Sequence, residues 1–294
     1  MPRQAHPDYV VDPDRGSSST PAKRARLVDV DVFDDRADTR AGLRELDQMT
    51  MQLPGLTGLQ RDRERIIPRD RSAAAGHPRM VRELPAAGTM RGPLSARQRN
   101  ARRKDRRAAQ ATMSLAQLRT QRQVVTQPHV WLSLNDELSE VVGDVQSLPD
   151  RTQDTIRRMD RSIQAYERHN DRGHVLYTNV QLPGYINPGN VTGFVRKNFE
   201  PGDRVAFDRY TAATHQLHET AGQLPNPTGS VVVFELQTRR GAYLGNSDKI
   251  DNTGHLLPRG LEFEVQGVEN VTYRGPDGHS GRRIVVQLLD VTPD

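Results

Sequence analysis

The distribution of aromatic residues most constrains where this chain can build a hydrophobic core. Of its fourteen Phe, Tyr and Trp residues, twelve lie at or after Trp131, and none occurs between Phe33 and Trp131. A segment without large apolar side chains, rich in Arg, Asp, Pro, Gly and Ser, cannot bury enough apolar area to offset its chain entropy. We therefore expect residues 1–128 to be a long, mostly disordered Arg-rich arm and residues 129–294 to form one folded domain.

The charges divide at the same place. Residues 1–128 carry 25 Lys and Arg against 15 Asp and Glu, whereas residues 129–294 carry 17 against 22. The chain has no cysteine, which excludes a disulfide scaffold, a Cys-ligated zinc site and a cysteine nucleophile. It shows neither a signal-peptide pattern nor an apolar run of transmembrane length. We expect no membrane contact and a virion or intracellular location.

Two basic segments of the arm suggest possible ligands. PAKRARLVD at 21–29 resembles a nuclear localisation signal, and a solvated charge run is the alternative interpretation. The denser run at 95–110 suits phosphate neutralisation, but it has no interleaved aromatics on which bases could stack. Its alternative is a flexible linker or a helix that is polar on all sides. The candidate nucleic-acid contacts are Arg102, Arg103, Lys104, Arg106 and Arg107.

The period of the apolar residues changes at Gly173. Before it, residues 150–169 predict a helix, because Asp150 is a natural N-cap and an apolar stripe follows at spacings of three or four. After it come five or six short stretches rich in β-branched and aromatic residues, with turns between them. Helices followed by short strands predict an α+β domain with mainly antiparallel sheets, and not a doubly wound parallel fold.

The order of these elements resembles the ADP-ribosyltransferase exoenzyme family of NAD-dependent toxins and effectors over about residues 148–291. TIRRMDRSIQAYERHNDRGHVLYTNV is similar to the helix and first strand of the family, and PGDRVAFDRYTAAT to its second strand. LLPRGLEFEV is similar to its fifth strand. The resemblance implies an ADP-ribosyltransferase-like fold, with two small, mainly antiparallel sheets packed against N-terminal helices.

The residues that perform the family's chemistry are missing at the matching positions. The arginine of the YRG-type strand falls on Thr178, and the first serine of the Ser-Thr-Ser motif falls on Ala212. The two glutamates of the Glu-x-Glu loop fall on Asn252 and Gly254. In the family, a carboxylate stabilises the oxocarbenium-like ribose and an arginine fork holds the pyrophosphate. The resemblance therefore implies a catalytically degenerate site.

A few side chains remain as candidates for chemistry or binding. Asp248 and Asp251 are close enough in sequence to replace the lost glutamates, although Asp is shorter by a methylene. His215 and His218 stand three residues apart, but no third ligand is apparent, so we expect a surface pair and no metal. NAD, if it binds, would contact residues at the family's cleft, namely Tyr177, Thr178, Tyr210, Thr214 and Asn252.

Two functions of different classes remain open at this stage. In the first, the fold serves as a structural or interaction module, for example in a virion or another assembly, and requires no cofactor. Its partner would then be a protein or a larger assembly, with nucleic acid possible through the basic arm. In the second, the chain is an active NAD-dependent ADP-ribosyltransferase, a toxin or effector that uses non-standard active-site residues.

Overall fold

A computed structural model describes residues 90–293, except 142, 171, 183–187, 223–230 and 246–252. The basic cluster at 21–29 lies outside the described residues, as do three candidate site residues, Asp248, Asp251 and Asn252. Within the described part of the chain, no helix is both long enough and apolar enough to cross a membrane.

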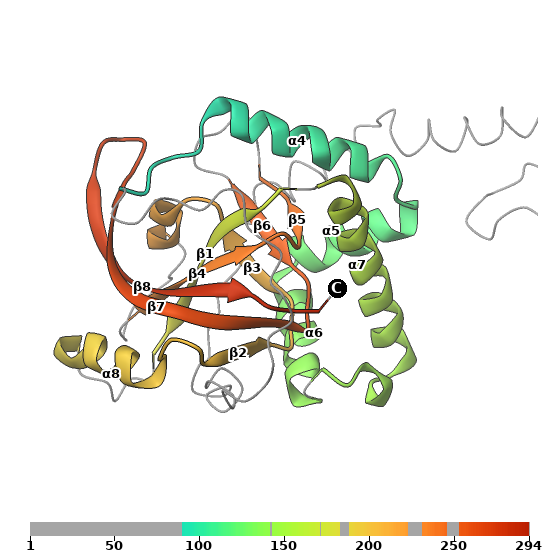
Figure 1. Cartoon of the computed structure of the whole chain (residues 1–294). Helices are drawn as coiled ribbons and strands as arrows, with labels where there is room; N and C mark the ends of the chain where they lie inside the picture. Colours follow the sequence, from blue (N-terminus) through green and yellow to red (C-terminus); the bar gives the residue numbers. More distant parts are fainter. Residues whose placement is uncertain are drawn as a thin grey trace, which may run out of the picture.

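Four helices come first in the described chain. They are α4 (Ala96–Gln110), α5 (Leu115–Thr126), α6 (Pro128–Glu140) and α7 (Asp150–His169). α4 and α5 each begin with a capping box, in which a serine and a glutamine three residues later satisfy each other's backbone N–H groups. α5, α6 and α7 lie together at one side of the strands and α4 runs across the top of the view, with α4 and α5 both packed against α7 (Figure 1).

The core between these helices forms around the predicted apolar stripe of α7. Ile156, Met159, Ile163 and Tyr166 are buried, together with side chains of α5 and α6 such as Trp131. The stripe predicted from the sequence is therefore confirmed.

The folded part begins earlier than the sequence analysis expected. α4 and α5 lie within the segment 1–128, which was expected to be mostly disordered, yet Ala109, Val124 and Val125 are buried in the helical core. The rule based on aromatic residues was wrong for these helices, because a helix can add small and aliphatic side chains to a core whose aromatics come from elsewhere.

The strands form one sheet in the order β2-β7-β8-β4-β1-β3-β6-β5. All neighbours are antiparallel except β4 and β8. The strands are β1 (His174–Gln181), β2 (Arg204–Phe207), β3 (Thr211–Thr214), β4 (Val231–Thr238), β5 (Ala242–Tyr243), β6 (Gly254–Leu257), β7 (Leu261–Arg274) and β8 (Ser280–Asp290). The short helices are η2 (Val145–Ser147), η3 (Pro188–Asn190), α8 (Val191–Asn198) and η4 (Leu217–Gly222). The predicted α+β class with mainly antiparallel strands is confirmed.

Two half-sheets meet at the joint between β1 and β3. Among the described residues, Tyr177 opposite Thr214 is the single register pair between these strands, whereas β1 and β4 pair along eight residues. The half-sheet β5-β6-β3 and the half-sheet β1-β4-β8-β7-β2 therefore correspond to the two small sheets that the sequence suggested. The larger one covers a second core, in which Phe234, Phe207 and Phe263 pack together.

The turn between β6 and β7 matches the sequence motif LLPRG. Gly260 has a φ of 74°, a left-handed conformation that glycine adopts without strain, and its N–H donates to the carbonyl of Phe207. Beyond the turn, Leu261, Phe263 and Val265 are buried and the two intervening glutamates are partly exposed, as the alternation predicted.

Helix α6 provides a matched test of the helical core. We expect Leu138→Ala to lower the free energy of unfolding by about 2–5 kcal/mol, because Leu138 is fully buried and its loss leaves a cavity. Leu132→Ala, on the same helix at a side chain that is 45% exposed, should change it by less than about 0.5 kcal/mol. Denaturant unfolding followed by circular dichroism measures both, and equal effects would contradict the packing described.

Candidate functional site

The positions that match the family motifs lie together at the joint of the half-sheets. Thr178 is fully buried on β1, and its Oγ1 donates to the carbonyl of Ala212 on β3 over 2.9 Å. Gly254, the first residue of β6, pairs with Thr214, the last residue of β3. The residues that the sequence assigned to three separate motifs are thus neighbours, on three adjacent strands.

A carboxylate that the sequence analysis did not consider stands at this joint. Glu219 of η4 is 6% exposed, and its Oε2 accepts hydrogen bonds from the hydroxyls of Thr214 and Thr253, the latter over 2.9 Å. Its Oε1 accepts from the amide of Gln216. Thr253 is the residue between the two positions of the lost glutamates. Asp248 and Asp251, the acids expected as substitutes, lie next to the Glu-x-Glu position, whereas Glu219 comes from a segment roughly thirty residues earlier.

Burial governs the charge of Glu219. Loss of hydration raises the pKa of this carboxyl to about 7, and the hydrogen bonds from Thr214, Thr253 and Gln216 counteract only part of that effect. The group therefore exchanges its proton near neutral pH. A carboxyl with this property can act as an acid, a base or a hydrogen-bond partner of the two strand ends.

A second polar group occupies the same face of the sheet. The guanidinium Nε of Arg91 lies 3.4 Å from Glu235 Oε2, and both side chains are almost fully buried. Glu235 pairs with Tyr177 across β4 and β1, so the two side chains share a face. Burial first, and the Glu235 carboxylate next, raise the pKa of Tyr177 well above its usual value.

The segment before α4 covers part of this face. The backbone of Arg91 bridges to the β7 strand beside Tyr273, and the N–H of Leu94 donates to Gln216 Oε1 over 2.7 Å. This segment thus reaches both polar groups of the face. Arg91 contacts Glu235 directly, and Leu94 contacts Gln216, which in turn binds Glu219. Tyr177, predicted to contact NAD, is 4% exposed beneath them.

Tyr210, the other tyrosine predicted to contact NAD, faces the helices instead. It is buried in the helical core, and its hydroxyl donates to Asp160 Oδ1 of α7 over 2.6 Å. Arg259, in the turn after β6, binds the other oxygen of Asp160 at 2.7 Å. Tyr177 and Tyr210 therefore lie in different hydrophobic clusters.

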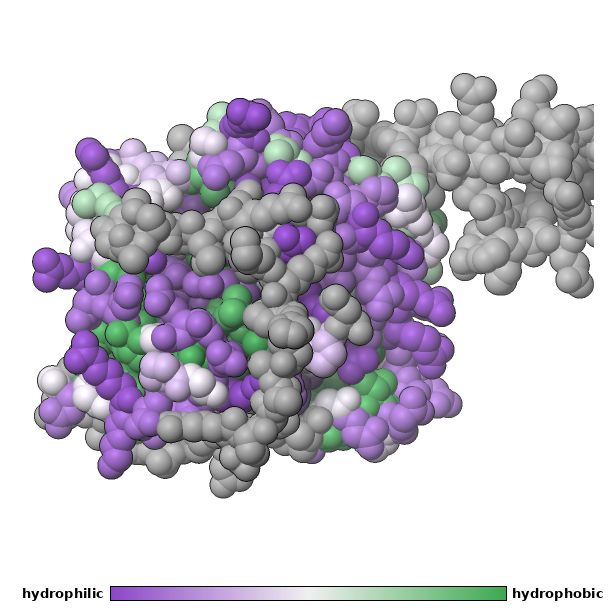
Figure 2. Space-filling model, viewed as in Figure 1, coloured by the Kyte–Doolittle hydropathy of each residue, from purple (hydrophilic) through white to green (hydrophobic). Residues whose placement is uncertain are grey.

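The basic run at 95–110 is helix α4, and part of its charge points into the domain. Arg102 is 1% exposed, and Arg106 donates to the carbonyls of Leu244 and Gly245, both at 2.9 Å. Lys104 and Arg107 are exposed, and the outer surface of α4 is hydrophilic (Figure 2). The expected linker or uniformly polar helix was wrong, because one face of α4 is packed against the domain.

Three histidines whose spacing in the sequence predicts no metal site meet in the interior. His174 begins β1, His215 follows β3 and His255 lies on β6, and all three are buried. The expected surface pair of His215 and His218 was wrong, because His215 turns towards histidines that are 40 residues away in the sequence. No spacing rule finds such a cluster, since each member comes from a different strand segment.

Comparison with known proteins supports the fold. No family model and no curated protein sequence matches this chain. Among solved structures, the C3 exoenzyme of Clostridium limosum aligns with 70% of this chain and 99% of its own, at 14% identity and a TM-score of 0.50. The enzymatic component C2-I of the Clostridium botulinum C2 toxin aligns with 67% of this chain and 47% of its own, at 12% identity and a TM-score of 0.51.

A third match, an ADP-ribosyltransferase from Clostridium botulinum, covers 72% of this chain and 99% of its own at 15% identity, with a TM-score of 0.47. The first two matches show that the fold of this chain is of the ADP-ribosyltransferase-like class. Within that class, the chain resembles the C3-like exoenzymes at low sequence identity, in agreement with the resemblance of its motifs.

The protonation of Glu219 gives a pH-dependent prediction. Its pKa is about 7 in the folded chain and about 4.3 in an unfolded one. Since the folded carboxyl holds its proton more tightly, its contribution to stability is complete below about pH 4.3 and is lost as the pH rises through about 7. The free energy of unfolding, relative to Glu219→Gln, should therefore fall by up to about 1.4 kcal/mol per pH unit within this window.

Denaturant unfolding of both proteins at about pH 5 and about pH 8 measures this difference. Glu269→Gln, which removes an exposed acid from β7, corrects for the general effect of losing one negative charge. A stability difference between wild type and Glu219→Gln that is the same at both pH values would contradict the prediction.

Proposed function

We propose that this chain uses the ADP-ribosyltransferase-like fold as a structural or interaction module and does not transfer ADP-ribose. The observation that carries the proposal is the internal pairing of the groups at the family's motif positions. Thr178 donates its hydroxyl to the Ala212 carbonyl, and Glu219 is bound by Thr214, Thr253 and Gln216. These contacts brace strand ends, and neither supplies the charged fork that would hold a pyrophosphate.

The loss of charge at two positions supports the same conclusion. A transition state with a developing oxocarbenium ion needs a carboxylate beside the ribose, and Gly254 has no side chain to provide one. Threonine at 178 has no positive charge with which to neutralise a phosphate. The carboxylate stabilises the transition state, so its loss lowers the rate by orders of magnitude even where a nucleotide still binds, and the loss of the arginine weakens binding of the pyrophosphate as well.

We expect the purified chain to show no NAD hydrolysis and no label transfer above the level of heat-denatured chain. The assay uses radiolabelled NAD, a mixture of candidate protein acceptors, and an active C3-type transferase as the positive control. Transfer well above the denatured control would contradict the proposal.

The alternative, an active transferase with non-standard residues, is favoured by one observation. Glu219 places a carboxyl next to Thr253, between the two positions of the missing glutamates, and its pKa of about 7 keeps part of it ionised at neutral pH. If label transfer occurs, Glu219→Gln should abolish it while Glu269→Gln leaves it unchanged. Loss in both variants would point to a general charge effect instead.

For the partner, we propose another protein or an assembly rather than nucleic acid. Of the five cations first assigned to nucleic acid, Arg102 and Arg106 are turned into the domain. Because these two side chains point inwards, α4 presents fewer positive charges to the phosphates of a nucleic acid. A groove between α5, α6 and α7, bordered by Gln123, Ser133 and Arg151 among others, offers a polar and apolar surface of the kind that proteins recognise.

A paired substitution tests this choice. We expect Lys104→Gln/Arg107→Gln on α4 to lower the affinity for duplex DNA no more than Arg157→Gln/Arg158→Gln, which removes two exposed cations from α7. Both affinities should be weak and should fall with salt, as for non-specific contacts. Fluorescence anisotropy over a salt series measures them, and a much larger loss for the α4 pair would establish nucleic acid as a partner.

A further inference from the structure

Three imidazole rings form a closed triangle where the two half-sheets meet. The ring centroids of His174 and His255 are 4.6 Å apart, those of His215 and His255 are 5.0 Å apart, and those of His174 and His215 are 5.1 Å apart. One ring nitrogen from each residue lies within 4.8 Å of the other two. The cluster adjoins the Glu219 site, because the N–H of His215 donates to Thr253 Oγ1 and the Thr253 hydroxyl donates in turn to Glu219.

We propose that these three histidines bind one divalent transition-metal ion that prefers nitrogen ligands, with zinc as the expected ion. Three imidazoles are a common donor set for zinc, and imidazole also suits copper and nickel. The chain has no cysteine that could serve as a competing ligand.

The hydrogen bonds of His255 leave the correct nitrogen available. Its Nε2 lies 3.1 Å from the carbonyl of Arg240, and because a carbonyl only accepts, this nitrogen must carry the proton. Nδ1 then keeps its lone pair. Metal-binding histidines characteristically donate their second N–H to a carbonyl in this way, which fixes the tautomer and the orientation of the ring.

The backbone near His255 is shaped to keep this contact. Gly241 has a φ of 99°, and a Cβ at that position would stand 2.7 Å from His255 Nε2. Only glycine therefore lets the turn after β4 pass so close to the ring. The N–H of Gly241 is held in turn by Glu167 of α7, over 2.8 Å.

The distance between the first two ligands fits a metal ion. His215 Nε2 lies 3.2 Å from His255 Nδ1. Two nitrogens bound at about 2.0–2.1 Å to a tetrahedral zinc ion are roughly 3.3 Å apart. A direct hydrogen bond between the rings would account for this distance equally well, so the third histidine decides between the two interpretations.

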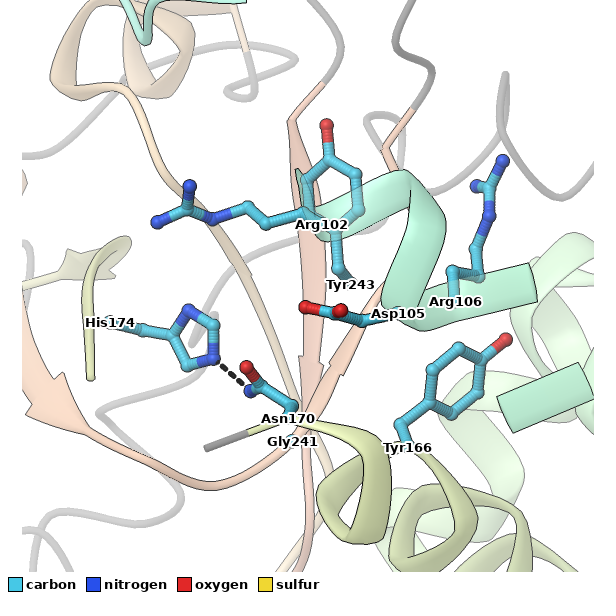
Figure 3. Close-up of a pocket in the computed structure, with 8 residues that line it drawn as sticks. All are labelled: Arg102, Asp105, Arg106, Tyr166, Asn170, His174, Gly241 and Tyr243. Atoms are coloured by element: carbon cyan, nitrogen blue, oxygen red, sulfur yellow. Dashed lines mark hydrogen bonds between the residues drawn. The ribbon is translucent and has the colours of Figure 1, made fainter. Parts of the chain in front are cut away.

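His174 has a nitrogen that the hydrogen-bond interpretation leaves without a role. The ring is fully buried, and its Nε2 contacts the side-chain amide of Asn170 (Figure 3). Metal binding through Nδ1 requires this amide to turn its oxygen towards Nε2, so that Nε2 donates its proton and Nδ1 keeps a lone pair. Among the described residues, Nδ1 has no hydrogen-bond partner. A buried polar nitrogen without a partner is unfavourable, and a metal ion would satisfy it. Binding requires the His174 ring to shift towards the other two.

The surroundings favour neutral imidazoles, and a small cavity adjoins one of the three rings. Burial lowers the pKa of all three histidines, and the positive charge of Arg102 lowers each further, so their lone pairs are available at neutral pH. A cavity of about 10 Å³, room for about one water molecule, adjoins His174, Asn170 and Tyr243 (Figure 3). Because Arg102 also repels a dication, we expect the ion to enter as the chain folds, before α4 closes over the site.

A metal at this point would connect β1, the end of β3 and β6, and so would strengthen the joint of the half-sheets. The role is structural, and the test does not depend on any reaction with NAD. The full chain is unfolded, refolded with Zn²⁺ or Co²⁺ and separated from excess metal by gel filtration. We expect about one ion per chain by elemental analysis. Co²⁺ should give the intense visible bands of a four-coordinate site, and excess Zn²⁺ should raise Tm by about 5–10 °C.

His174→Gln and His255→Gln should abolish the bound metal. Glutamine keeps a polar group near the position of Nε2, for Asn170 and for the Arg240 carbonyl, while it removes Nδ1. His279→Gln, which replaces a histidine whose side chain is 91% exposed, is the matched control and should retain the full metal content. Metal content in His174→Gln or His255→Gln equal to that of the wild type would overturn the proposal.

The wild-type protein alone also decides the question if a variant fails to fold. Refolded wild type that retains no metal, shows no four-coordinate Co²⁺ spectrum and has the same Tm with Zn²⁺ and with a chelator would overturn the site.

Discussion

The arrangement of this fold depends on a joint that the backbone hardly holds. Within the part of the chain that the structure describes, the two half-sheets share one register pair, Tyr177–Thr214, in place of a long ladder of backbone hydrogen bonds. Side chains replace it. Thr178 reaches the Ala212 carbonyl, and Glu219 connects the end of β3 with the start of β6. The polar character of the site at the joint follows from this need, since open strand ends must find partners in the interior.

Such a joint is stable only if each of its buried polar groups has a hydrogen-bond partner or an opposite charge, or is neutral. The Arg91–Glu235 pair illustrates this, because removing either partner would leave the other buried without its opposite charge. Glu219 and the histidines adapt differently, by shifting their pKa values towards the neutral form. The two apolar cores, one on the larger half-sheet and one among the helices, carry most of the hydrophobic stabilisation on either side. The polar joint lies between them and fixes how they are oriented.

The sequence predicted those features that follow from local pattern. The stripe of α7, the Pro258–Gly260 turn and the alternation in β7 each depend on residues within a few positions, and the order of elements then indicated the fold. α4 and α5 were missed because composition alone does not show that a helix can contribute small side chains to a distant core. Glu219 and the three histidines were missed because each meets its partners only after several strands have paired. The motif positions were predicted from the register that the resemblance supplied, and in the structure Thr178, Ala212 and Gly254 lie on adjacent strands.

The position of α4 has a consequence for how the chain folds during synthesis. Its side chains reach residues that are made much later, as in the contact between Arg106 and Leu244, 138 residues apart. At about 5–20 residues per second, α4 leaves the ribosome roughly 7–30 s before that partner exists. A 15-residue helix is marginal alone in water, even with a good cap. α4 can pack against α7 once that helix has been made, but its contacts with β5 and with Leu244 must wait until β4 to β6 have formed. The many arginines that make α4 a poor core helix suit it to that interval, because their charge keeps the waiting segment hydrated.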